Sequence, residues 1–217
     1  MEKNEIYVRH RFLKEEGNMD IVCVPAGILR ANSYLLTQDG KDAVLIDCGG
    51  PEPLAEAKRR GLAVRAVLLT HGHFDHIGGC AALQGAGARI GCSEAELPLI
   101  FSQDNLAAEV GVRIPPFTVD LTFRGGDELD LCGIRFSVIA TPGHTPGGVC
   151  FRTEGALFTG DTLFCGSVGR TDFPGGSGAQ LRDSVRRLLA LPGDLPVYPG
   201  HDEPTSLAYE RKYNPFR

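Results

Sequence analysis

A run of candidate metal ligands between Thr70 and Gly79 constrains this chain more than any other feature. The run reads T-H-G-H-F-D-H-I-G-G and follows the apolar segment Val64–Leu69, which is typical of a buried strand. Imidazoles and carboxylates suit zinc and similar ions, and a catalytic site takes three protein ligands and leaves one position for water. The run offers four ligands, which exceeds the need of one ion and predicts two neighbouring ions: His71, His73, Asp75 and His76.

The composition excludes several other functions. The chain has 217 residues, which suits one domain spanning 1–217. Lys and Arg total 22 against 27 for Asp and Glu, so the net charge of -5 gives no basic footprint for nonspecific nucleic-acid binding. No apolar stretch approaches the ~18 residues of a membrane span, and residues 1–10 lack the apolar core of a signal peptide. We therefore expect a cytoplasmic protein with a small-molecule substrate and neither a nucleic-acid nor a membrane partner.

The predicted elements fall into two halves, each with strands followed by helices. The first half has expected strands at Met19–Val24, Asn32–Thr37, Ala43–Ile46 and Val64–Leu69, and expected helices at Pro51–Arg60 and Ile77–Gln84. A helix and then a loop are expected within Glu94–Pro116. The second half has expected strands at Glu128–Leu131, Ile134–Ala140, Val149–Thr153, Ala156–Thr159 and Pro196–Tyr198, and one helical face formed by Leu181, Val185, Leu188 and Leu189. This order is compatible with two packed sheets and helices outside, although periodicity does not select this over other α/β layerings.

Three further candidate ligands share one local pattern. His144 lies in T-P-G-H-T-P-G-G, His201 in Y-P-G-H-D-E and Asp161 in F-T-G-D-T-L-F, so each follows a predicted strand and a glycine. A single histidine after a turn is more often a surface or core residue than a ligand. Here five of the six histidines lie in such strand-end segments, and none of the five is expected within a helix. The sixth, His10, lies in a charged N-terminal segment and is expected on the surface.

The candidate ligands divide into two sets and a bridge. His71, His73 and His144 are expected to hold one ion, and Asp75, His76 and His201 the other. Asp161 is expected to bridge them, and both Asp75 and Asp161 to act in catalysis. Two ions roughly 3.5–4 Å apart can share a hydroxide and stabilise an oxygen that gains charge. Asp47, which follows another strand, is expected either to orient a ligand or to cap a turn.

This pattern resembles the metallo-β-lactamase superfamily: H-x-H-x-D-H, then a distant His, Asp and His in that order. The resemblance covers the chain from about Met19 onward. It implies a four-layer αββα sandwich with the site at the end of the two sheets, and it supports the ligand sets above. The donor types accept zinc, iron or manganese, and we expect two divalent ions, with zinc as the first choice.

Two segments resemble the glyoxalase II (hydroxyacylglutathione hydrolase) branch: G-D-T-L-F at Gly160–Phe164 and G-R-T-D-F at Gly169–Phe173. The tail T-S-L-A-Y-E-R-K-Y-N-P-F resembles its short bacterial members. In that branch two metals activate a hydroxide for attack on the thioester carbonyl of S-acylated glutathione. The resemblance implies a dinuclear, metal-dependent thioesterase. A thiolate-liganded metallo-β-lactamase would have Cys where Asp161 stands, which disfavours that activity.

The substrate contacts are less closely matched to that branch. Arg170 matches a Lys that holds glutathione there, while Asp172 stands near the expected place of a Tyr. The helical C-terminal domain that adds basic contacts in that branch is not expected here. Arg170 is expected either to bind a substrate carboxylate or to pair with Asp172. Phe164 and Phe173 are expected to line the acyl or thiol pocket, or to pack locally.

Two alternatives remain open at this level. Persulfide dioxygenases are relatives that share G-R-T-D-F and an H-D pair like His201-Asp202, and they hold a single iron. Its ligands would correspond to His71, His144 and Asp161. The other alternative is a metal-binding member without catalytic activity, which is disfavoured because every ligand position is present.

Overall fold

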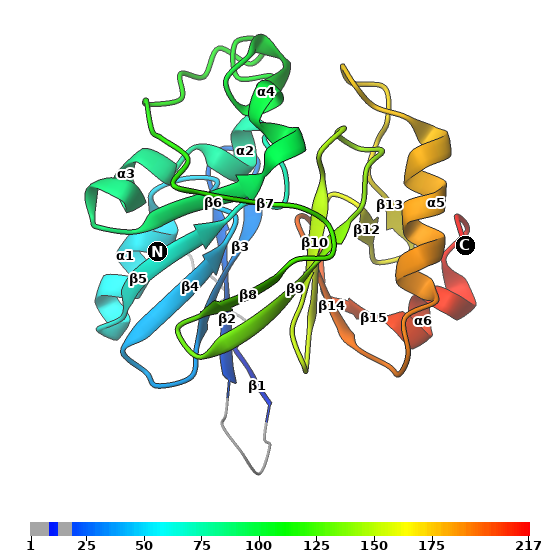
Figure 1. Ribbon diagram of the computed structural model, residues 1–217, viewed down its shortest axis with the longest axis horizontal. Coiled ribbons are helices and arrows are strands. Elements are labelled where there is room, and N and C mark those ends of the chain that lie inside the picture. The colour runs from blue at the N-terminus through cyan, green and yellow to red at the C-terminus, as the bar shows by residue number, and fades with distance from the viewer. Residues whose placement is uncertain (1–8, 13–18) are drawn as a thin grey trace, which may run out of the picture.

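The computed structural model describes residues 9–12 and 19–217, with side chains from residue 19 onward, and its strands form two large sheets (Figure 1). The first sheet has the order β1 to β7: β1 Arg9–Phe12, β2 Met19–Ala26, β3 Ala31–Thr37, β4 Asp42–Ile46, β5 Ala63–Leu68, β6 Arg89–Ser93 and β7 Leu121–Phe123. Strands β1 to β4 are antiparallel, whereas β4 to β7 are parallel. The change occurs where helical crossovers replace tight turns.

The second sheet is formed by the C-terminal half of the chain. Its order is β15 Thr205–Ser206, β14 Pro196–Pro199, β11 Leu157–Gly160, β10 Val149–Arg152, β9 Ile134–Ala140 and β8 Glu128–Leu131. A separate hairpin joins β12 Leu163–Phe164 to β13 Ser167–Val168. Because β9 and β11 both run antiparallel to β10, and β14 runs parallel to β11, these three strands end at the same edge of the sheet.

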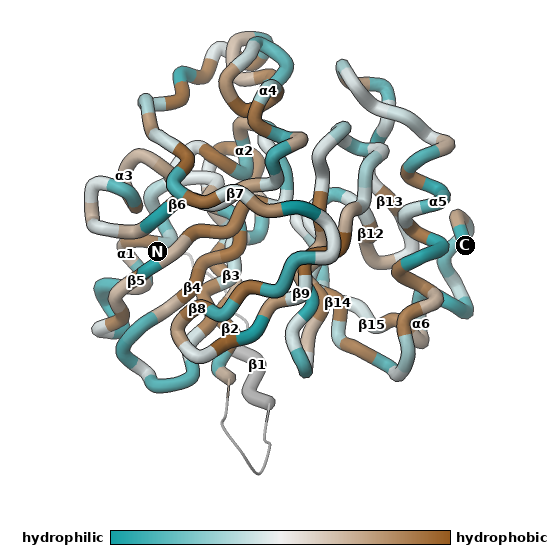
Figure 2. Tube along the Cα trace, viewed as in Figure 1, coloured by the Kyte–Doolittle hydropathy of each residue, from teal (hydrophilic) through white to brown (hydrophobic). Residues whose placement is uncertain are grey.

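Helices cover the outer faces of both sheets (Figure 1). On the first sheet lie α1 Glu52–Arg60 and α3 Cys80–Gly85, with α2 Phe74–Ile77 and α4 Leu97–Ile100 near its edge, and on the second lie α5 Gly178–Leu189 and α6 Leu207–Tyr213. One hydrophobic core lies between the two sheets, and one lies between each sheet and its helices. Figure 2 shows hydrophobic residues concentrated along β3 and β4. The expected four-layer αββα sandwich is therefore confirmed.

Helix α5 shows how the sequence produces the outer layer. Its N-cap residue Ser177 accepts a hydrogen bond from the backbone N–H of Gln180, which satisfies one unpaired donor of the first turn. The expected apolar face points inward, with Leu181, Val185 and Leu188 at most 3% exposed. Burying such a side chain stabilises the fold by about 1.5–3 kcal/mol. Three buried residues at helical spacing thus fix α5 against the second sheet.

Two predictions about helices near the motif are wrong. The helix expected at Ile77–Gln84 is two short helices, α2 and α3, separated by Gly78 and Gly79. The backbone there pairs with another loop instead of continuing a helix: Gly79 N–H donates to Cys48 O, and Cys48 N–H donates to His76 O, both at 2.8 Å. Because α2 begins at Phe74, His76 lies within a helix, contrary to expectation.

Other sequence expectations differ in smaller ways. Within Glu94–Pro116 the structure contains three short helical turns, of which α4 is one, followed by a turn at 107–111 and a loop. Strand β1 was not predicted, and it pairs antiparallel with β2. The expectation for the side chain of His10 lies outside the described residues. Among the helices of the described ranges, none combines the length and the apolar character that a membrane crossing requires.

Candidate metal centre

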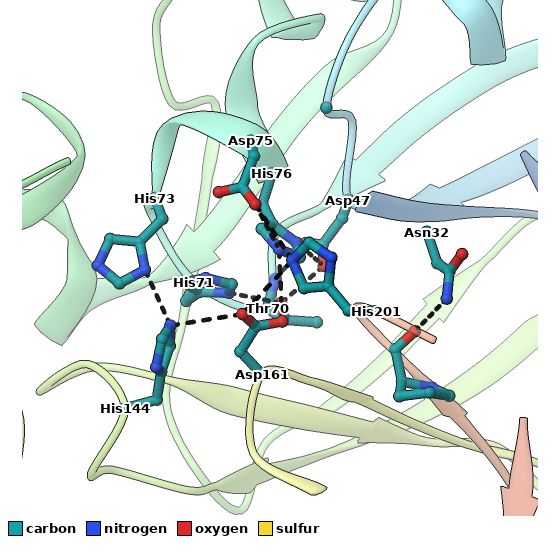
Figure 3. A network of polar contacts seen from close by, with 12 residues as sticks. Asn32, Asp47, Thr70, His71, His73, Asp75, His76, His144, Asp161 and His201 are labelled. Carbon is teal, nitrogen blue, oxygen red and sulfur yellow. Dashed lines mark hydrogen bonds and ion pairs between the residues drawn. The ribbon is translucent and has the colours of Figure 1, made fainter. Parts of the chain in front are cut away.

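The candidate ligands meet where the two sheets end at a common edge (Figure 3). From the second sheet, β9, β11 and β14 end shortly before His144, Asp161 and His201. From the first sheet, the loop after β5 and helix α2 carry the remaining four: His71, His73, Asp75 and His76. The two edges are joined by backbone hydrogen bonds from Val149 N–H to Thr70 O at 2.9 Å and from Asn32 N–H to Gly200 O at 2.7 Å.

The first group of donors contains three imidazoles. Ligand atoms of His71, His73 and His144 all lie within 4.8 Å of one another, and all three residues are buried. His73 Nδ1 lies 2.9 Å from His144 Nε2. The structure thus brings together the same three histidines that the sequence assigned to one ion.

The second group combines two imidazoles with a carboxylate. Ligand atoms of Asp75, His76 and His201 also lie within 4.8 Å of one another. The Oδ2 of Asp75 is 3.1 Å from His201 Nε2 and 3.7 Å from His76 Nε2. These are the residues assigned to the second ion, although they come from α2 and from the loop after β14.

Asp161 lies between the two groups. Its Oδ2 is 3.6 Å from His144 Nε2 in the first group and 3.7 Å from His201 Nε2 in the second. Its Oδ1 is 3.4 Å from His76 Nε2. The Oδ2 of Asp161 thus lies near both groups and its Oδ1 near the second, so this one carboxylate is within reach of both.

Gly200 makes this approach sterically feasible. A Cβ at this position would overlap the Oδ1 of Asp161 and would lie 2.8 Å from the Cε1 of His76. Only glycine therefore allows the loop before His201 to pass so close to Asp161.

Two hydrogen bonds hold ligand imidazoles in place, and one comes from Asp47, whose ligand atom also lies within 4.8 Å of those of His71 and His76. Asp47 Oδ2 lies 2.8 Å from His76 Nδ1, and its two oxygens also accept from Thr70 N–H and Thr70 Oγ1, both at 2.7 Å. His144 Nδ1 lies 2.7 Å from the carbonyl oxygen of Arg170. A carbonyl only accepts, so Nδ1 carries the proton and Nε2 points its lone pair into the site. Asp47 thus makes the contact with a ligand imidazole that its expected orienting role requires.

Two imidazoles of the first group, those of His71 and His73, are held in the neutral form. Burial, reinforced by the neighbouring imidazoles, holds the pKa of His71 well below its usual 6.5. The same effects lower the pKa of His73 to about 3. A neutral imidazole has a free lone pair, which is the form that binds a metal ion.

Carboxylates surround the imidazole of His76 in the second group. Burial acts to lower the pKa of His76, but surrounding carboxylates outweigh it and raise the pKa to about 10. These carboxylates belong to Asp75, Asp161 and Asp47. Burial opposes ionisation of Asp75, yet His76 and His201 hold its pKa below the usual 3.8. An excess of carboxylate charge in a buried site attracts a cation.

The donor set fits divalent metal ions, because it leaves buried lone pairs facing one another. Within residues 19–217, four of these buried atoms have no hydrogen-bond partner: His71 Nε2, His73 Nε2, His76 Nε2 and Asp161 Oδ1. Buried polar atoms in folded proteins are nearly always paired. Ions bound to imidazole nitrogens and carboxylate oxygens would satisfy them.

Sequence reasoning missed two residues that hold these loops in place. Thr70 Oγ1 donates to Asp47 and lies 3.1 Å from His71 Nδ1, so it links a ligand to an orienting carboxylate. Asn32 Nδ2 donates to Pro199 O and Asp202 O, on either side of His201. Thr70 lies beside the motif and could have been found there. The contact of Asn32 joins positions far apart in the sequence, and local patterns carry no signal for it.

The expected substrate-contact residues surround the centre. The ring of Phe173 lies 5.5 Å from that of His73, and the ring of Phe164 lies 6.2 Å from that of His201. Arg170 pairs with Asp172: its Nε and Nη2 donate to the two carboxylate oxygens at 2.7 and 2.5 Å. Its guanidinium also lies 4.0 Å from the centroid of the Phe173 ring. The ion pair expected as one role of Arg170 is thus present.

Fold and site together define a metal-binding α/β sandwich of the hydrolase type. The chain belongs to the metallo-β-lactamase superfamily, whose family profile matches residues 26–201 and whose members are mostly hydrolases. It is 37% identical to the hydroxyacylglutathione hydrolase GloC of Haemophilus influenzae, over 91% of this chain and 98% of that protein. It is 40% identical to an uncharacterized protein of Mycobacterium tuberculosis, over 91% of this chain and 97% of that protein.

Solved structures give the same fold. The BLEG-1 B3 metallo-beta-lactamase is 35% identical, with a TM-score of 0.85 over 90% of this chain and 98% of that one. TTHA1623, solved in a di-iron-bound form, is 40% identical, with a TM-score of 0.80 over 90% of this chain and 99% of that one. The recognised superfamily is confirmed, and the donor set and family together support divalent metal ions at the site.

Proposed function

We propose that this protein is a dinuclear metal-dependent hydrolase that cleaves a small S-acyl thioester of the hydroxyacylglutathione type. The observation that carries the proposal is the geometry of the two donor groups, each with three ligands, and of Asp161 between them. Relatives named hydroxyacylglutathione hydrolase support the thioester as substrate class.

Two bound ions would activate water for attack on the thioester carbonyl and stabilise the charge that develops on its oxygen. The reaction forms a carbon–oxygen bond and breaks the carbon–sulfur bond, and it releases a carboxylic acid and a thiol. Asp47 and the carbonyl of Arg170 hold Nδ1 of His76 and of His144, which leaves their Nε2 atoms facing the site where the ions would bind. Asp161 lies within reach of both groups and would contribute a carboxylate oxygen to the ions bound there.

Phe164 and Phe173 supply apolar surface on two sides of the centre, which suits the acyl group and the stem of the thiol. Arg170 would meet an anionic group of the substrate only in competition with Asp172, which already accepts two of its hydrogen bonds. We therefore propose an S-acyl thiol whose recognition depends on the reacting centre more than on a distant carboxylate.

The test is metal analysis combined with a substrate panel. Protein purified without added metal is expected to hold two ions per chain and to hydrolyse S-hydroxyacyl glutathione and simpler thioesters, with free thiol as the readout. One iron per chain with oxygen uptake on glutathione persulfide would instead establish the mononuclear iron persulfide dioxygenase. The complete second donor group speaks against that alternative.

A β-lactam is the second candidate substrate, because one similar structure bears the name of a B3 metallo-beta-lactamase. Both candidates share attack on an acyl carbon, so the same site serves either reaction. Turnover of a chromogenic β-lactam that exceeds turnover of every thioester in the panel would replace the thioesterase proposal.

A further inference from the structure

A buried carboxylate outside the ligand set connects two of the ligand loops. Glu96 follows β6 at the end of a short helical turn and is 1% exposed. Its Oε1 accepts from Gly72 N–H at 2.9 Å. Its Oε2 accepts from Thr145 Oγ1 at 3.0 Å and from Gly147 N–H at 2.8 Å. All three donors are buried, so Glu96 is held by hydrogen bonds at both carboxylate oxygens.

The partners of Glu96 are neighbours of metal ligands. Gly72 lies between His71 and His73, and Thr145 directly follows His144. A single side chain therefore connects the two loops that supply the three-histidine group, one from each sheet. Gly147 packs so closely on Glu96 that a Cβ there would overlap the Glu96 backbone N and lie 2.6 Å from Oε2.

We propose that Glu96 is a positioning residue that determines the metal affinity of the three-histidine group. The metal affinity of the other group is not expected to depend on Glu96. The proposal rests on the two-metal site proposed above. The proposal follows from the hydrogen bonds. Glu96 accepts from Gly72, which lies between His71 and His73, and from Thr145 and Gly147, which follow His144. Fixed loops keep three imidazole lone pairs convergent before an ion arrives.

The second group has an anchor of its own, which makes the proposal selective. Asn32 Nδ2 donates to Pro199 O at 3.1 Å and to Asp202 O at 2.9 Å, and Tyr34 Oη donates to Pro199 O at 2.6 Å. These bonds hold the loop of His201. Substitutions at Glu96 and Asn32 are therefore expected to weaken different ions.

Glu96→Gln is the sharpest perturbation because it preserves shape and removes acceptor capacity. A carboxylate accepts at both oxygens, whereas the amide of Gln donates at one end. In one orientation its NH2 faces Gly72 N–H, and in the other it faces Gly147 N–H. Either way a buried donor meets a donor, and one of the two loops is released.

The experiment measures zinc affinity of the metal-free protein by competition with a chromophoric chelator. In a His201→Ala background, which retains the three-histidine group, Glu96→Gln is expected to weaken binding about 10- to 100-fold. In a His144→Ala background, which retains the other group, Glu96→Gln is expected to leave binding unchanged. Asn32→Ala is expected to show the reverse selectivity.

Glu210→Gln is the matched control for loss of a buried carboxylate. Glu210 is 0% exposed and accepts from Gly166 N–H, Thr205 Oγ1 and Asn214 Nδ2, away from the ligands. It is expected to lower the melting temperature and to keep both zinc affinities. If Glu96→Gln does not fold, Thr145→Val removes one donor to Glu96 and is expected to give a smaller loss at the same group.

Equal weakening of both groups by Glu96→Gln, or no weakening of the three-histidine group, would overturn the inference. A wild-type protein that binds one ion would overturn the dinuclear function instead. The His201→Ala background still tests Glu96 in that case, so the two failures are distinguishable.

Discussion

Asp47→Asn tests how far a carboxylate beside the two proposed donor groups controls the centre. The Oδ1 of Asp47 accepts from Thr70 N–H, and its Oδ2 accepts from Thr70 Oγ1 and faces His76 Nδ1 at 2.8 Å. If the Asn NH2 replaces Oδ1, it faces the backbone N–H of Thr70. If it replaces Oδ2, His76 must accept at Nδ1 and carry its proton on Nε2, where the ion would bind.

The magnitude follows from these two orientations. Loss of a hydrogen bond to a buried charged group costs about 1.5–3 kcal/mol of unfolding free energy, and Asp47 is 2% exposed. Loss of an orienting partner lowers metal affinity about 10- to 100-fold, equivalent to about 1.4–2.7 kcal/mol. We expect the loss in affinity at the group that contains His76.

The assay is chelator competition for zinc affinity, together with urea unfolding of the metal-free protein. Asp120→Asn is the control, because Asp120 also accepts from a backbone N–H, that of Ile90 at 2.9 Å, but lies outside the centre. Two unchanged zinc affinities in Asp47→Asn, with an unfolding free energy within about 0.5 kcal/mol of wild type, would refute the reasoning.

Three further substitutions probe the bridge, the substrate side and the fold. Asp161→Asn removes one bridging oxygen and is expected to lower zinc affinity about 10- to 100-fold and to reduce thioester turnover; full turnover with two ions retained would contradict the bridge. Asp172→Asn frees Arg170 and is expected to lower the KM for anionic thioesters a few-fold without changing that for neutral ones, as steady-state kinetics would show. Leu188→Ala, at a fully buried position of α5, is expected to lower the free energy of unfolding in urea by about 2–5 kcal/mol and to leave the zinc affinities unchanged. A drop in zinc affinity would show that packing of the outer helix affects the metal centre.

The sequence marks His144, Asp161 and His201 as strand-end residues that follow a glycine, and the structure brings them together with the motif after β5. Apolar runs before His71, His144 and His201 predict strands, and strands that run the same way end at the same edge. Local pattern and global arrangement therefore agree at these positions. The grouping of the ligands around Asp161 then follows from the number of donors that each ion needs.

The parts that the sequence did not predict depend on contacts between distant segments. Helix α2 begins at Phe74 and ends before Gly78 because the backbone pairs with Cys48, a residue far from it in the chain. The roles of Asn32 and Glu96 depend on loops of the opposite sheet. Neither residue has a distinctive local context, so only the packed sheets show what they do.

Each donor group draws on both halves of the chain. The segment after β5 supplies two histidines of the first group and lacks His144, and it supplies two ligands of the second group and lacks His201. An arrangement in which the sheets dock out of register thus offers only incomplete sets of donors. Metal ions that bind only complete sets of donors would therefore stabilise the correctly docked molecule relative to misassembled forms. Their effect would extend to folding as well as to chemistry.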